Sequence, residues 1–155
     1  MRKLNLLILA AWILHVGSWF LPAIKAHDFQ PPLPGWKAFR FAACAVWPCE
    51  YIQFDSTYHA VLATVSVTTT LFFVLCSPWV VMRGPRSLRR WSAWAAATAF
   101  LFNTHWIVIF GPQRWELTIG YYLWWLSFFL LAIGLALSLE KKRIDGPVGS
   151  RARIS

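Results

Sequence analysis

Four long apolar segments follow one another along the chain, each close to the length that a helix needs to cross a bilayer. A crossing helix requires about 20 mostly apolar residues, and a charged side chain at its centre costs roughly 3 kcal/mol. None of the four segments contains Asp, Glu, Lys or Arg. The pattern predicts an all-α membrane protein with transmembrane helices at about residues 4–24, 58–82, 91–111 and 117–139.

The connections between these segments differ greatly in length. Residues 83–90 and 112–116 form short links, so helices two to four should pack as antiparallel neighbours. We therefore expect one antiparallel four-helix transmembrane domain, residues 1–142, with a long ordered external loop at 25–57. Residues 143–155, with several Gly, Pro and Ser, predict a disordered cytoplasmic tail.

The basic residues predict how the chain is oriented. Eleven of the 15 Lys and Arg lie before the first segment, between the second and third, or after the fourth. The positive-inside rule places both termini and the Arg-rich loop 83–90 in the cytoplasm. The first segment follows Met-Arg-Lys, as in a signal peptide, but no small-x-small cleavage site follows it, so we expect a retained anchor. The basic residues expected on the outer side are Lys25, Lys37, Arg40 and Arg114.

Composition supports the membrane interpretation. Apolar residues make up 58% of the 155 residues and charged residues 14%, with 11 Trp and 12 Phe. A soluble domain has about 25% charged residues, and Trp favours the bilayer interface. The net charge of +9 does not indicate nucleic-acid binding, because the basic residues flank apolar segments, where they set topology and contact lipid headgroups.

The expected external loop carries the most distinctive side chains. Prolines at 31, 32 and 34 predict an extended start, and residues 36–47 predict a short amphipathic helix on the outer membrane surface. Its apolar face would carry Trp36, Phe39 and Trp47, with Ala43, while Arg40 and Lys37 project elsewhere. Two interpretations stay open: a lid that packs over the bundle, or a partner-binding surface made of Trp36, Phe39, Arg40 and Trp47.

Two cysteines lie in the same loop. Cys44 and Cys49 are five residues apart, and Pro48 permits a turn between them, so an oxidising exterior favours a structural disulfide. A redox-active pair is the alternative, although the spacing differs from that of thioredoxin-like sites. Cys76 is expected to be a buried apolar residue.

Three short strings resemble a known group of proteins: Trp19-Phe20-Leu21-Pro22, Leu33-Pro34-Gly35-Trp36 and Ala38-Phe39-Arg40. They are similar to the first span and loop of small four-span bacterial inner-membrane proteins, most of them without an assigned activity. The resemblance covers about the first third of the chain and implies an inner-membrane location. It implies no activity. Four-helix thiol-oxidising quinone reductases are a poorer comparison, because residues 112–116 lack the second cysteine pair.

Two histidines, His15 and His105, lie inside apolar segments, at similar expected depth in the outer half of the bilayer. Histidines on different helices can bind a haem iron or hydrogen-bond a quinone. They can equally bond a facing hydroxyl, such as those of Ser18 or the second segment, and simply hold helices together. Other possible metal ligands lie in or beside the loop: His27, His59, Asp28, Glu50 and Asp55. Their spacing is not that of a known metal site, so no metal site is predicted.

The sequence shows neither a membrane-embedded carboxylate nor a nucleophile motif, so we do not expect an enzyme. The leading hypothesis is a non-enzymatic accessory subunit that binds a membrane-protein partner, or another copy of itself, through the external loop and helix packing. The second is a redox protein that binds haem or quinone through His15 and His105, with Cys44 and Cys49. The third is a small channel or lipid-handling protein that uses the hydroxyl-rich second segment, with Thr68 and Thr69.

Overall fold

The structure, a computed structural model, describes residues 2–25, 31–47, 49 and 56–144. Most of these residues are helical, which confirms the expected class at that level. The single described sheet is an antiparallel hairpin of β1 (Pro22–Ile24) and β2 (Leu33–Pro34). The helices are α1 (Arg2–Ser18), α2 (Gly35–Ala43), α3 (Thr57–Leu71), the π-helix η1 (Phe72–Cys76), α4 (Ser77–Arg83), α5 (Arg86–Asn103), α6 (His105–Phe110), the 3₁₀-helix η2 (Gly111–Glu116) and α7 (Ile119–Ile144).

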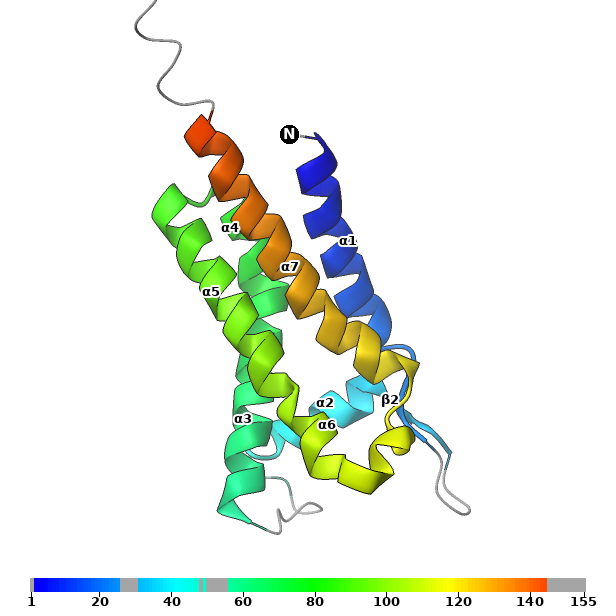
Figure 1. The fold of residues 1–155 in the computed structure, drawn as a ribbon. Coiled ribbons are helices and arrows are strands. Elements are labelled where there is room, and N and C mark those ends of the chain that lie inside the picture. Colours follow the sequence, from blue (N-terminus) through cyan, green and yellow to red (C-terminus); the bar gives the residue numbers. More distant parts are fainter. Residues whose placement is uncertain (1, 26–30, 48, 50–55, 145–155) are drawn as a thin grey trace, which may run out of the picture.

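The long helices lie side by side (Figure 1). α1 and α5 run in one direction, while α3 with α4 and then α7 run in the other. α7 packs against both α1 and α5, and its Phe128 and Leu131 share a buried core with Phe73 and Ala96. The start of α1 and the end of α7 lie at one end of the molecule. α2, the hairpin, α6 and η2 gather at the other, which we call the α2 end.

Among the described residues, two helices are long and apolar enough to cross a membrane, Thr57–Val80 and Ile119–Glu140. The first predicted segment, 4–24, is helical only to Ser18. Beyond it, backbone N–H groups bond three residues back, as in Trp19 to Val16 at 3.1 Å. Pro22 then disfavours helical geometry in the residue before it, and the chain enters the hairpin.

The third predicted segment, 91–111, also differs from a single apolar helix. α5 begins earlier, at Arg86, and includes the charged Arg89 and Arg90 in its first turns. It ends at Asn103, and α6 follows after Thr104. The apolar stretch is therefore divided between two helices. The fourth segment is longer than expected, because α7 continues to Ile144; the remainder of the expected disordered tail, 145–155, lies outside the described residues.

A proline interrupts the second segment without ending it. Pro78 has no N–H to donate to the carbonyl four residues earlier, and its ring would clash with that carbonyl in a regular α-helix. The turn before it widens into η1, a π-helix, which accommodates such an irregularity. The Ser77 hydroxyl donates to the Phe73 carbonyl at 2.5 Å. The helical run from Thr57 to Arg83 stays continuous, with a local widening at Phe72–Cys76.

Candidate functional site at the α2 end

The hairpin fixes where α2 begins. Gly35 N–H donates to the Leu21 carbonyl, and Trp36 N–H donates to the Trp19 carbonyl, both at 2.9 Å. A Cβ atom on Gly35 would lie 2.5 Å from the Ser18 carbonyl oxygen, so only glycine permits this approach. Two of the three strings that carry the inner-membrane resemblance, 19–22 and 33–36, are therefore paired in space.

The hairpin is also bonded to the start of α7. Lys25 N–H donates to the Glu116 carbonyl at 2.7 Å, and Thr118 N–H donates to the Ala23 carbonyl at 3.0 Å. A Cβ atom on Gly120 would lie 2.5 Å from the Pro22 carbonyl oxygen. The hairpin thus joins the end of α1, the start of α2 and the start of α7 into one unit.

α2 turns a small-residue face toward the other helices. Gly35, Ala38, Phe39 and Ala42 lie at positions i, i+3, i+4 and i+7, which is one face of a helix, and all four line a cavity beneath α2. The Phe39 ring stacks on Trp19 with centroids 5.2 Å apart. The lid interpretation therefore applies to the inner face of α2, the face that covers the cavity.

The predicted apolar face of this helix was wrong in part. α2 ends at Ala43 rather than at 47, because the next residues form a tighter turn in which Cys44 N–H bonds the Phe41 carbonyl at 3.1 Å. Trp47 therefore lies beyond the helix and is 82% exposed, and Trp36 is 44% exposed. Phe39 packs inward, whereas Arg40 is exposed. The four residues proposed to bind a partner do not form one face.

The predicted cysteine pair is present. The sulfur atoms of Cys44 and Cys49 are at disulfide distance, and their Cα atoms are 5.3 Å apart. The bond closes the turn that follows α2 and so fixes the C-terminal end of that helix. Cys76 contradicts its prediction: it is exposed on η1 and not buried, because the residue falls on the outer face of the widened turn.

The cavity under α2 has a volume of about 260 Å³. α2 and the hairpin cover one side, and α3, α6, α7 and the C-terminal end of α1 supply the rest. α3 contributes Ala63 and Val67, and α7 contributes Tyr121 and Trp124. Its surface is almost entirely apolar. The cavity is the described feature of this end that has room for a ligand.

The polar groups on the cavity wall bond to one another. The Ser66 hydroxyl donates to Asn103 Oδ1 at 2.6 Å and accepts from the Trp106 indole N–H at 2.9 Å. The Trp124 indole N–H donates to the Thr70 hydroxyl at 3.1 Å. These bonds connect α3 with α5, α6 and α7.

Asn103 is the centre of this network and was not singled out from the sequence. It is fully buried, and its Nδ2 donates to the Ala99 carbonyl at 2.8 Å. The backbone carbonyl of Asn103 accepts from the Tyr121 hydroxyl at 2.7 Å. An amide inside an otherwise apolar segment needs a buried partner. This requirement is the sequence signal by which Asn103 could have been found.

His15 lies deeper among the helices, in what we call the His15 layer: His15, Phe73, Ser127 and Phe128. Its Nδ1 bonds the Ser127 hydroxyl at 2.8 Å, and Ser127 donates to the Trp124 carbonyl, so the ring proton belongs on Nδ1. Phe73 stacks on the ring at 4.1 Å, and Phe128 meets it edge-on at 5.3 Å. Closely packed rings surround the imidazole, and its Nε2 is buried without a hydrogen-bond partner among the described residues.

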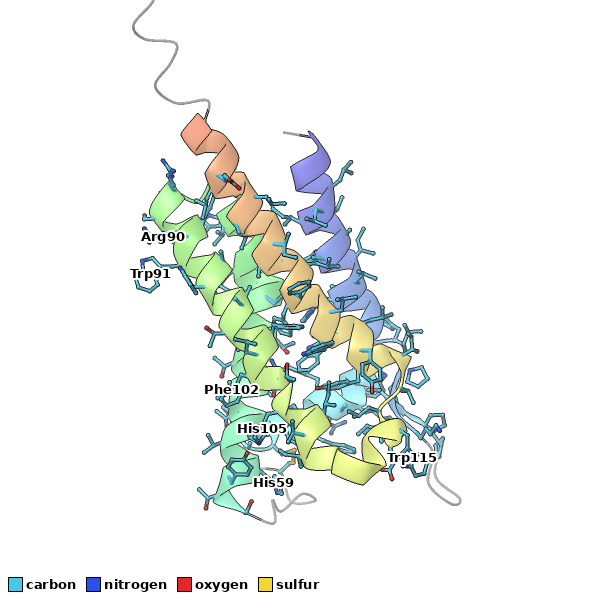
Figure 2. All side chains as sticks on the ribbon, in the orientation of Figure 1. His59, Arg90, Trp91, Phe102, His105 and Trp115 are labelled. Atoms are coloured by element: carbon cyan, nitrogen blue, oxygen red, sulfur yellow. A yellow bond between two sulfur atoms is a disulfide. The ribbon has the colours of Figure 1, made fainter. Side chains whose placement is uncertain are left out.

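His105 lies far from this layer. Its Nε2 bonds the Tyr58 hydroxyl, and Figure 2 shows it near His59 at the α2 end. Tyr58 and Phe73 are 15 residues apart on one helical run, which at 1.5 Å per residue is roughly 22 Å. The two histidines are therefore at different depths, and the structure does not bring them together to hold one haem or quinone.

The remaining candidates contribute no assembled site in the described residues. The Thr68 and Thr69 hydroxyls bond the carbonyls of Thr64 and Val65 at 2.8 and 2.9 Å, on their own helix. Within the described ranges no group of three or more His, Cys, Asp or Glu could hold a metal ion. His27, Asp28, Glu50 and Asp55, considered with His59 as an outer metal site, lie outside those ranges.

No protein-family model, curated protein or solved structure matches the chain. The similarity to small four-span inner-membrane proteins therefore stays a prediction from three short strings. What the structure adds is that two of these strings, 19–22 and 33–36, are hydrogen-bonded to one another where α2 begins.

Proposed function

We propose that the chain crosses a bacterial inner membrane four times, with both termini in the cytoplasm and the α2 end outside. Four apolar segments support this, two of them helices long enough to cross. The alternating helix directions support it too (Figure 1). Arg90 lies at the opposite end from Trp115 and His59 (Figure 2), as the positive-inside rule requires.

We further propose that the protein is a non-enzymatic accessory subunit that binds an integral membrane partner through the outer surface of α2. One observation carries this proposal: α2 and the turn that follows it are firmly held, yet each exposes a tryptophan. The hairpin, the Phe39–Trp19 stack and the Cys44–Cys49 pair fix α2, yet Trp36 and Trp47 stay exposed. Tryptophan side chains on a rigid support are typical centres of protein interfaces, because little conformational entropy is lost on binding.

The charges beside these rings indicate the chemistry of the partner. Lys37 and Arg40 are exposed on α2, and the Lys37 ammonium lies 5.5 Å from the centre of the Trp36 ring. A complementary surface would present acidic residues around an apolar centre. We therefore expect a partner with an acidic outer segment next to its own membrane helices.

Purification in mild detergent from native membranes tests this proposal. The tagged protein should retain a membrane partner, and the Trp36→Ala/Trp47→Ala double variant should lose it. The matched control is Trp91→Ala/Trp94→Ala, because these rings are 73% and 64% exposed and Trp91 lies far from the α2 end (Figure 2). A lone monomer, or equal loss of the partner in both double variants, would overturn the proposal.

A further inference from the structure

We propose that the cavity under α2 binds a single hydrocarbon chain. The first argument is the chemistry of its wall. The hydroxyls of Ser66 and Tyr121 donate to Asn103, and the Ser18 hydroxyl donates to the His15 carbonyl at 2.6 Å. Since these donors are already engaged, a polar ligand would lose its own hydration without gaining partners there. An apolar chain has no such cost.

The indole groups strengthen this argument. The N–H groups of Trp106 and Trp124 point to Ser66 and Thr70 on α3, so their bonds run along the wall. The rings themselves line the cavity and offer apolar faces to its contents. The network therefore supports an apolar space and keeps its polar atoms occupied.

The volume limits the ligand to one chain. A cavity of about 150 Å³ holds one benzene molecule, about 25 Å³ for each carbon, and on that scale the 260 Å³ available here hold about ten carbons. The small residues Gly35, Ala38 and Ala42 on α2 leave this space open. Larger side chains at these positions would fill it.

The location indicates where the rest of the ligand lies. If the α2 end is outside, as proposed above, the cavity opens near the lipid headgroups. Exposed Lys37 and Arg40 on α2 would favour a chain whose headgroup is a carboxylate or a phosphate. The shared chemistry is an acyl chain, which a free fatty acid or a phospholipid carries with such a headgroup; a quinone has a neutral headgroup and serves as the comparison.

Photolabelling identifies the chain and its source. The purified full-length protein in mild detergent is given three probes with a diazirine near the end of the chain: a free fatty acid, a phosphatidylglycerol and an isoprenoid quinone. After irradiation, peptide mass spectrometry locates the labelled residues. We expect label on cavity residues such as Phe39, Val67 and Trp124. The probe that labels most strongly identifies the source.

Two cavity-filling variants test the site against ordinary lipid contact. Ala42→Phe acts from α2 and Ala63→Phe from α3, and both should abolish labelling inside the cavity. Ala10→Phe is the matched control, because Ala10 is exposed on α1 and should leave that labelling unchanged. Thermal midpoints are measured for all three, so that a variant that merely fails to fold is recognised; Ala42→Phe lies on the covering helix, where the other helices are least affected.

Label that appears only on outward-facing residues would overturn the proposal, as would cavity labelling that persists in both folded Phe variants. The outcome is independent of partner binding. The Trp36→Ala/Trp47→Ala variant, whose rings do not line the cavity, should keep its labelling even where it loses the partner.

Discussion

The His15 layer and the α2 end both contain aromatic and hydroxyl side chains. They differ in whether the space among those side chains is filled. In the His15 layer, the imidazole stacks on Phe73 at 4.1 Å, and the Phe73 and Phe128 rings meet edge-on at 5.2 Å. At the α2 end, the rings of Trp106 and Trp124 lie around a cavity.

The difference follows from the directions of the hydrogen bonds. Phe rings have no polar atom, so they can pack at any position that brings their faces and edges together. A half-buried or buried indole usually directs its N–H at an acceptor, and here Trp106 donates to Ser66 and Trp124 donates to Thr70. The small residues of α2 then leave the centre unfilled. The first region is therefore closely packed, and the second encloses a cavity.

The largest effect is expected when the packed layer is broken. Phe73→Ala should lower the free energy of unfolding by about 3–5 kcal/mol, because it removes a fully buried ring and leaves a hole. Phe20→Ala is the control, since Phe20 is 77% exposed. Reversible SDS titration in micelles measures both. If Phe73→Ala cost no more than Phe20→Ala, the layer would not be a close-packed support.

The disulfide should matter to the α2 end alone. Cys44→Ser/Cys49→Ser removes a cross-link that closes a short loop. The entropy regained by the unfolded chain should lower the free energy of unfolding by about 2 kcal/mol. The loss should be confined to α2 and the turn after it, because the hairpin still holds the start of that helix. Hydrogen exchange should become faster in α2 and stay unchanged in α7. Cys76→Ser serves as the control, and faster exchange throughout would show that the two regions unfold together.

The comparison also shows which features could be read from the sequence. The apolar segments and the cysteine pair were predictable, because each depends on a local pattern. The end of α1 was missed because the apolar run continues through Trp19–Ile24 while Pro22 and the hairpin stop the helix. The true inner face of α2 has small residues at 35, 38 and 42. A search for large apolar side chains therefore selected Trp36 and Trp47 instead.

The tertiary features were harder to predict. Helix length alone suggested similar depths for His15 and His105, but α1 ends early and α5 begins early, so the two helices are shifted relative to one another. The helix widens before Pro78 instead of ending there. Whether a helix widens or ends at a proline depends on the room that the neighbouring helices leave. Asn103 could have been noticed as a lone amide in an apolar segment, but its partner Ser66 is 37 residues away.

A smaller effect is expected from the centre of the polar network. Asn103→Ala removes the acceptor of Ser66 and the bonds to the Ala99 carbonyl and the Thr69 hydroxyl. At about 0.6 kcal/mol for each bond in a membrane protein, the loss should be about 1–2 kcal/mol. Thr98→Ala, at an exposed position on the same helix, should change little. Equal losses in the two variants would mean that the network does not hold α3 to α5.

The smallest effect separates two threonines on one helix. The Thr70 hydroxyl accepts from the Trp124 indole, whereas the hydroxyl of the exposed Thr68 donates to the Thr64 carbonyl on its own helix. Thr70→Val leaves the half-buried Trp124 indole N–H without its partner and should cost about 0.6 kcal/mol. Thr68→Val should cost less than this, because the site is exposed and the side chain keeps its shape. The Trp124 ring should also gain freedom in Thr70→Val alone, which labelled-indole NMR detects as a shift of its N–H resonance. If the two variants behaved alike, the orientation of Trp124 would not depend on Thr70, and hydrogen bonding along the wall would not explain why the α2 end is open while the His15 layer is filled.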